Sequence, residues 1–249
     1  MQAPSRYDKL GFKVVLEKDW LDLSLNLMMH GKSPQEIREK LKADIYSSGK
    51  RSELTTKFAV QILRAWFAPD EDLIHFRNQL LDAARKLPQE RWVVLHWACL
   101  TAAYPFLLSF STVLGRLLFL QDKTNKALLL ARLQDIYGTR ETVERALYYA
   151  LGTFANLGLL QRDSRNTILT APPKITIEDD RVGFLLWESV ILATKGNRIP
   201  ITTLCGSPAF YAFDMPDLRA AQQHKAFPDI CCQQYGDEII LAIPKTHFR

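Results

Sequence analysis

An uncharged run near the middle of the chain is the feature that most limits how it can fold. Twenty-four residues without a formal charge, WVVLHWACLTAAYPFLLSFSTVLG, lie between Arg91 and Arg116. This length is sufficient for a membrane-spanning helix. Pro105, however, disfavours helical geometry at Tyr104 and divides the run into two pieces of about 12 residues. Because polar side chains such as His96 also interrupt it, we predict two helices buried in a protein core and no membrane partner.

Composition favours a cytoplasmic protein that folds without disulfides or metals. With 249 residues, 47% of them hydrophobic, the chain can bury a sufficient core by itself. Its four cysteines show neither C-x-x-C spacing nor a cluster with histidine, so we expect reduced thiols, no metal and no cofactor. The N-terminus lacks the continuous apolar stretch of a secretory signal.

Two helix starts are well marked in the N-terminal third. Residues 33–36, SPQE, form a capping box with proline at the first helical position, and apolar residues then recur at steps of four. A second helix is predicted to begin at Ser52 and to end before Pro69. The face that we expect it to bury consists of Leu54, Phe58, Ile62 and Trp66.

The segment from 125 to 170 has the order of a winged helix. A short helix over 125–137 is expected to turn Leu129, Leu133 and Ile136 inward, and Gly138-Thr139 then forms a tight turn. A longer helix over 140–157 follows, and after it LLQR and TILT predict a hairpin joined by residues 163–166. In a winged helix, the second helix of the helix-turn-helix enters the DNA major groove and the hairpin, or wing, contacts the backbone.

The outward side of the longer helix is suited to DNA. At 100° per residue, its buried face is predicted to hold Val143, Leu147, Ala150 and Phe154. The opposite face holds Arg145, Tyr148, Tyr149, Gly152 and Asn156, and Arg140 and Thr142 lie in the first turn. Guanidinium groups and free backbone N–H groups at such a position can meet phosphate or base edges. Glu141 and Glu144 oppose this unless they pair with arginine.

Two further basic groups could contact phosphate. The wing carries Arg162 and Arg165 beside Asn166. Lys50, Arg51 and Lys57 surround the helix start at residue 52 and are predicted to form an auxiliary phosphate site, with an ordinary solvated surface as the alternative. A net charge of +5 is compatible with a polyanionic partner but does not require one.

We find no sequence signature of catalysis. The common phosphate-loop, dinucleotide, zinc-protease and serine-hydrolase motifs are all missing from the sequence. His96, in its apolar helix, is interpreted as a hydrogen-bonded core residue. We therefore predict a protein that is not an enzyme.

The order of these motifs resembles the BrxA family, the small component of bacteriophage-exclusion (BREX) defence systems. The resemblance spans roughly residues 20–170 and rests on HGKSPQEIREKL, on HWACLTAAYPFLLSF and on DIYGTRETVERALYYALGTFANLGLL. It implies a compact helical protein that binds double-stranded DNA with little sequence preference. It also implies a setting beside a methyltransferase, a large ATPase and a phosphatase-like protein.

The fold class predicted from all of this is mainly α: a compact multi-helix protein with a central winged-helix or helix-turn-helix unit and small β-hairpins. We divide it into an N-terminal helical subdomain (1–68), an apolar core with the winged helix (69–172) and a C-terminal α+β subdomain (173–249). The predicted function is a non-catalytic DNA-binding accessory protein of phage defence. An assembly adaptor that docks protein partners and a winged-helix transcription regulator remain the alternatives.

Overall fold

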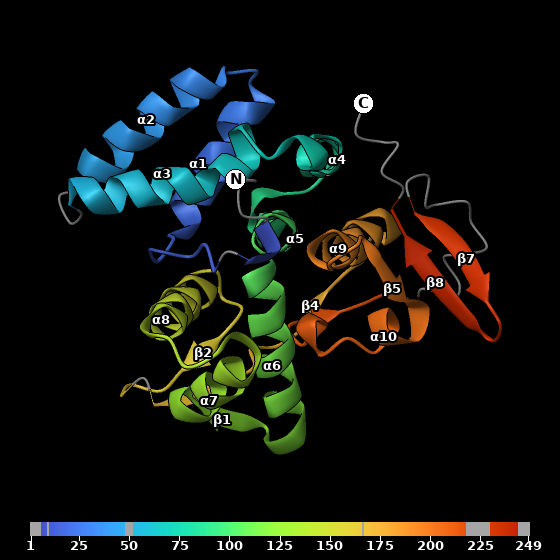
Figure 1. Ribbon diagram of the computed structural model, residues 1–249. Coiled ribbons are helices and arrows are strands. Elements are labelled where there is room, and N and C mark those ends of the chain that lie inside the picture. The colour runs from blue at the N-terminus through green and yellow to red at the C-terminus, as the bar shows by residue number, and fades with distance from the viewer. Residues whose placement is uncertain (1–5, 9, 48–51, 166, 218–229, 244–249) are drawn as a thin grey trace, which may run out of the picture.

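The computed structural model describes residues 6–8, 10–47, 52–165, 167–217 and 230–243, and it is mainly helical with small sheets, as predicted (Figure 1). The α-helices are α1 (Lys18–Met29), α2 (Pro34–Ser47), α3 (Glu53–Phe67), α4 (Ile74–Ala84), α5 (Trp92–Ala103), α6 (Pro105–Gln121), α7 (Lys126–Tyr137), α8 (Glu141–Asn156), α9 (Asp180–Ala193) and α10 (Ile201–Cys205). Short 3-10 helices are η1 (Arg6–Asp8), η2 (Glu71–Leu73), η3 (Gln89–Arg91) and η4 (Pro208–Phe210).

Three small sheets accompany the helices. One contains β1 (Lys123–Asn125), β2 (Gln161–Arg162) and β3 (Ile168–Thr170), another β4 (Ile175–Thr176) and β6 (Phe213–Asp214), and the last β5 (Arg198–Pro200), β7 (Cys231–Tyr235) and β8 (Glu238–Ala242). The β4–β6 pair is parallel, and all other pairs are antiparallel. One of the small β-hairpins that the fold class predicts is β7–β8, which is joined by Gly236 and Asp237, with Gly236 at φ +60°.

The uncharged run forms two core helices, as the sequence predicts. All residues of α5 from Trp92 to Ala102 are buried, and α9 packs along it. At Tyr104 and Pro105 the chain turns into α6, which lies at 117° to the preceding helix. Among the described residues no single helix is both long and apolar enough to cross a membrane; only the bent pair, taken together, meets those criteria.

The capping residues in the sequence predict the starts of α2 and α3 correctly. The Ser33 backbone N–H donates to the Glu36 carboxylate at 2.8 Å, and the Glu36 N–H donates to the Ser33 hydroxyl at 3.3 Å, which is the predicted capping box. At the start of α3, the Thr55 N–H donates to the Ser52 hydroxyl at 3.2 Å. Ile37, Leu41 and Ile45 are all fully buried.

Two of the residues predicted to be buried are exposed instead. Leu54, in the first turn of α3, is 60% exposed, whereas Ile62 and Trp66 of the same predicted face are buried, as expected. Ile136 is 56% exposed. Its expected place in the core is taken by the next residue, Tyr137, whose hydroxyl lies 2.8 Å from the Ser109 hydroxyl and whose ring contacts Phe106.

The elements from α6 to β3 pack as one group (Figure 1). The chain order is α6, β1, α7, α8, β2, β3, and the strand order is β1-β3-β2. The predicted hairpin is present, with Gln161 opposite Thr170 and Arg162 opposite Leu169. The predicted inward residues of α8, namely Val143, Leu147, Ala150 and Phe154, are all buried.

One connected core includes buried residues from each of the three predicted subdomains. The N-terminal residues reinforce this connection: Arg6 pairs with Asp72, and the Tyr7 hydroxyl donates to the Leu192 carbonyl at 3.0 Å. The domain boundaries at 68 and 172 stay a prediction.

The one histidine of α5 is held by α1. His96, fully buried, lies 2.8 Å from a carboxylate oxygen of Asp22, whose other oxygen accepts from Lys18 at 2.6 Å and from Gln89 at 3.0 Å. Burial raises the pKa of Asp22, but these hydrogen bonds outweigh it and hold the pKa at about 2. Burial lowers the pKa of His96 below 6.5, although the carboxylate acts in the opposite direction. His96 is therefore a hydrogen-bonded core residue, as predicted.

We expect the folded protein to lose stability as the pH falls below 6.5. The unfolded chain protonates His96 near pH 6.5, whereas the folded protein resists this because the ring is buried, so protons stabilise the unfolded state. Below the ordinary Asp22 pKa of 3.8 the same sign holds for the carboxylate, and its contribution is lost as the pH approaches 2. The free energy of unfolding should fall as the pH drops below the ordinary histidine pKa of 6.5, by at most about 1.4 kcal/mol per pH unit for this one proton. Urea titrations at pH 7.0, 6.0 and 5.0 measure it.

The His96→Gln variant is the control for this assignment. Glutamine has no titratable group, so the pH dependence between 7 and 5 should become shallower than in the wild type even though the variant is less stable at every pH. Equal slopes in the two proteins would assign the acid sensitivity to other groups.

Candidate nucleic-acid interface

The N-terminal end of α8 is open to solvent. Arg140, Thr142 and Arg145 are all exposed. Arg140, the residue before the helix, supplies no side-chain cap to the free backbone N–H groups of the first turn. Its guanidinium instead donates to the carbonyl of Tyr137, at 2.7 and 3.1 Å, and so closes the end of α7. The first turn of α8 thus presents uncapped N–H groups beside two arginines.

The carboxylates of this helix are paired. Glu141 forms an ion pair with Arg145 one turn later. Glu144 pairs with Lys126 of α7 at 3.2 Å. Their negative charge is therefore partly balanced, although Arg145 is engaged rather than free.

The predicted DNA-facing side is open at the first turns of α8 and at Asn156, but the prediction for Gly152 is wrong. Gly152 is buried, and a Cβ atom there would lie 2.6 Å from a methyl group of Val15. The Asn156 side chain is exposed but donates to the Leu16 carbonyl at 3.0 Å, and the Thr153 hydroxyl accepts from the Leu16 N–H at 2.9 Å. This side of the helix is covered by residues 12–17, a contact that the sequence pattern could not show.

Tyr148 and Tyr149 differ in exposure. Tyr148 is 59% exposed, whereas Tyr149 is half-buried and packs against the core. Their ring centroids lie 5.5 Å apart in an edge-on arrangement.

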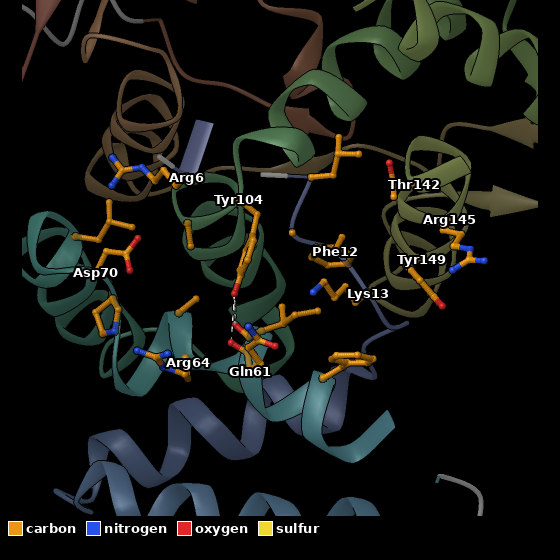
Figure 2. A pocket seen from close by; sticks show the side chains of 18 of the residues that line it. Arg6, Phe12, Lys13, Gln61, Arg64, Asp70, Tyr104, Thr142, Arg145 and Tyr149 are labelled. Atoms are coloured by element: carbon orange, nitrogen blue, oxygen red, sulfur yellow. Dashed lines mark hydrogen bonds between the residues drawn. The ribbon is translucent and has the colours of Figure 1, made fainter. Parts of the chain in front are cut away.

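A cleft of about 710 Å³ lies between α8 and α3 (Figure 2). Thr142, Arg145 and Tyr149 line it from the α8 side, together with Arg140 at the helix start. The opposite wall contains Gln61 and Arg64 of α3, and Tyr104 donates to the carbonyls of Gln61 and Ile62 at 3.3 and 3.2 Å. Residues 10–13 cross between the two walls.

The basic residues of this cleft that the sequence did not predict include Lys13 and Arg64. Lys13 lies in an extended segment with no helical periodicity, and its ammonium group is 5.4 Å from the centroid of the Phe58 ring. Arg64 was assigned only to a helix. Neither residue carries a local signal that places it near α8, because both positions depend on contacts between distant parts of the chain.

The β2–β3 loop is closed by one carboxylate. Asp163 accepts from the backbone N–H groups of Thr167 and Ile168 at 2.6 and 2.9 Å, and from the Thr167 hydroxyl at 2.8 Å. These bonds, led by the one from the Ile168 N–H, lower the pKa of Asp163. Arg162 and Arg165 are exposed, as predicted, while Asn166 lies outside the described residues.

Of the predicted auxiliary phosphate site, the structure describes Lys57. Lys57 is exposed on α3, one turn before Gln61, and therefore on the same side of the helix as the wall of the cleft. Lys50 and Arg51 lie outside the described residues.

Of the four cysteines, Cys99 is buried, whereas Cys205, Cys231 and Cys232 are exposed. Within the described ranges no group of three or more His, Cys, Asp and Glu side chains could hold a metal ion.

Comparison of the chain with protein-family models, with curated proteins and with solved structures found no match in any of the three.

The contact between α8 and residues 12–17 can be tested at Gly152. In Gly152→Ala, the new methyl group would overlap Val15, whose branched side chain has little freedom to move away. We expect a loss of about 1–3 kcal/mol in the free energy of unfolding, as for other overpacked sites. Denaturant titration measures this.

Ala155→Gly on the same helix is a control for helix propensity. At this partly exposed position it should lower the free energy of unfolding by roughly 1 kcal/mol through backbone freedom alone. Restoration of stability by Val15→Ala in the Gly152→Ala background would identify the overlap as the cause. A Gly152→Ala protein as stable as the wild type would contradict the close approach.

Proposed function

We propose that this protein binds double-stranded DNA through the N-terminal turns of α8 and the β2–β3 loop. The observation that carries the proposal is the open first turn of α8, where Arg140, Thr142 and Arg145 are exposed beside backbone N–H groups without a side-chain cap. A helix N-terminus with adjacent cations is a ready site for phosphate.

The topology supports a winged-helix interpretation. The chain order α6, β1, α7, α8, β2, β3 and the strand order β1-β3-β2 are those that this interpretation requires. In such a unit α8 is the recognition helix and the β2–β3 loop is the wing. Arg162 and Arg165 would then contact the DNA backbone while α8 enters the groove.

The acidic residues of α8 do not oppose this placement strongly. Glu141 and Glu144 already have cationic partners. The Glu141–Arg145 pair has side chains 73% and 65% exposed, and such a solvated pair contributes little to stability. Because a guanidinium has five N–H donors, Arg145 can bind a phosphate while keeping Glu141 as its partner.

We further propose that the protein acts as an accessory component of a BREX phage-defence system, without catalysis and with little sequence preference. This part rests on the resemblance of residues 20–170 to the BrxA family. Contacts made by arginine and by backbone N–H groups to phosphate are the same at every sequence.

The Arg140→Ala/Arg145→Ala double variant tests the DNA-binding surface. It should bind a random duplex more weakly than the wild type, and the slope of log affinity against log salt should become shallower by about 2, because two phosphate contacts are lost. Fluorescence anisotropy at several salt concentrations measures both quantities.

A matched control is Arg85→Ala/Lys86→Ala, which removes the same charge from exposed positions after α4. It should bind like the wild type. Unchanged affinity in a folded Arg140→Ala/Arg145→Ala protein would refute the placement, and a strong preference for one duplex sequence would favour a transcription regulator instead.

A second candidate function, that of an adaptor which docks a protein partner, is favoured by an exposed apolar pair. Phe119 and Leu120, at the end of α6, are 88% and 72% exposed. Single exposed apolar side chains are ordinary, but two adjacent ones at this exposure are typical of contact surfaces.

The adaptor function predicts that Phe119→Ser/Leu120→Ser retains the fold and the duplex affinity but loses co-purification with a methyltransferase, ATPase or phosphatase-like BREX component. Pull-downs with each purified component measure this. Equal recovery of every component by the variant and the wild type would remove the candidate.

A further inference from the structure

The cleft between α3 and α8 has an unbalanced charge. Its lining includes the cations Lys13, Arg64 and Arg140, and none of these forms an ion pair with a carboxylate in the described part of the chain. Asp70 is the single acidic residue among the lining residues. These three cations have no carboxylate partner there, although Arg64 and Arg140 donate to backbone carbonyls, so an anion that entered the cleft would find positive charge to balance its own.

Aromatic rings stand beside these cations. Phe58 of α3 lines the cleft. So do Tyr104 of the α5–α6 turn and Tyr149 of α8, which are labelled in Figure 2. The Lys13 ammonium group already lies 5.4 Å from the Phe58 ring centroid, so a cation and a ring adjoin at one point. A ligand that carries both a flat ring and an anionic group would therefore find an aromatic side chain for its ring and a cation for its anionic group.

The size of the cleft fits a small molecule. Its volume of about 710 Å³ lies within the range of roughly 300–1,000 Å³ that is usual for ligand sites. Such sites combine apolar and aromatic walls with a few convergent polar groups. The mixture of rings, cations and one carboxylate here has that character.

We propose that this cleft binds a nucleoside polyphosphate. The phosphates lie among Lys13, Arg64 and Arg140, and the base lies against the aromatic side chains, of which Phe58 is the one that adjoins a cation. Asp70 accepts a hydrogen bond from a ribose hydroxyl or from an amino group of the base. This inference does not rest on the proposed DNA binding, since the ligand can be titrated without DNA.

Isothermal titration with ATP, in EDTA and at low salt, tests the proposal on the full chain. The wild type should bind ATP, and adenosine and tripolyphosphate should each bind at least tenfold more weakly, because each lacks half of the recognised chemistry. Lys13→Ala/Arg64→Ala should weaken ATP binding at least tenfold, while Arg85→Ala/Lys86→Ala should leave it unchanged. Both pairs are exposed and remove the same charge.

Phe58→Leu separates ring recognition from charge. It should weaken ATP binding several-fold without changing the affinity for tripolyphosphate. The proposal fails if the wild type does not bind ATP at millimolar concentration, or if a folded Lys13→Ala/Arg64→Ala protein binds ATP as the wild type does. It also fails if tripolyphosphate equals ATP and Phe58→Leu changes nothing, because the cleft would then be a plain anionic contact. Thermal melting checks each variant, and Arg64→Gln replaces the double variant if that protein does not fold.

Discussion

The burial of α5 on every side is the constraint on which the rest of the structure depends. A helix with no polar face cannot lie at a surface, so other elements must surround it, and α9, α6, α4 and α3 do so. This requirement brings the C-terminal part of the chain against the centre and draws all regions into one core. The buried imidazole inside the helix, that of His96, is stabilised by a hydrogen bond with Asp22 of α1. This hydrogen bond fixes α1 against α5, two helices that are far apart in the sequence.

Sequence patterns predicted those features that are decided within a few residues. The capping box at Ser33, the helix start at Ser52 and both hairpins formed as expected, since their hydrogen bonds join near neighbours. The predictions that were wrong concern residues whose contacts lie far away in the sequence. Tyr137 packs against the core in place of Ile136, because its ring contacts Phe106 and its hydroxyl bonds to that of Ser109, both in α6. The periodicity within α7 does not predict these contacts. Gly152 appeared to face outward because its partner, Val15, lies more than a hundred residues away.

The candidate site was likewise predicted on one side only. Arg140, Thr142 and Arg145 lie where the helical spacing placed them, at the exposed start of α8. The facing wall of the cleft was not foreseen, because Lys13 belongs to a segment without regular structure and Arg64 to a helix with its own amphipathic pattern. Helical periodicity shows which side chains leave the core, but it does not show which other surface they will meet.

The bonds from residues 12–17 to α8 determine how wide the cleft can be. The backbone N–H and carbonyl of Leu16 form hydrogen bonds with Thr153 and Asn156, and Val15 packs against Gly152. The two walls are consequently spaced by packed main chain and not by an adjustable loop. Exchanging Val15 for a larger or smaller residue would therefore change how closely residues 12–17 approach α8, and with it the width of the cleft, while leaving every charge of the lining in place.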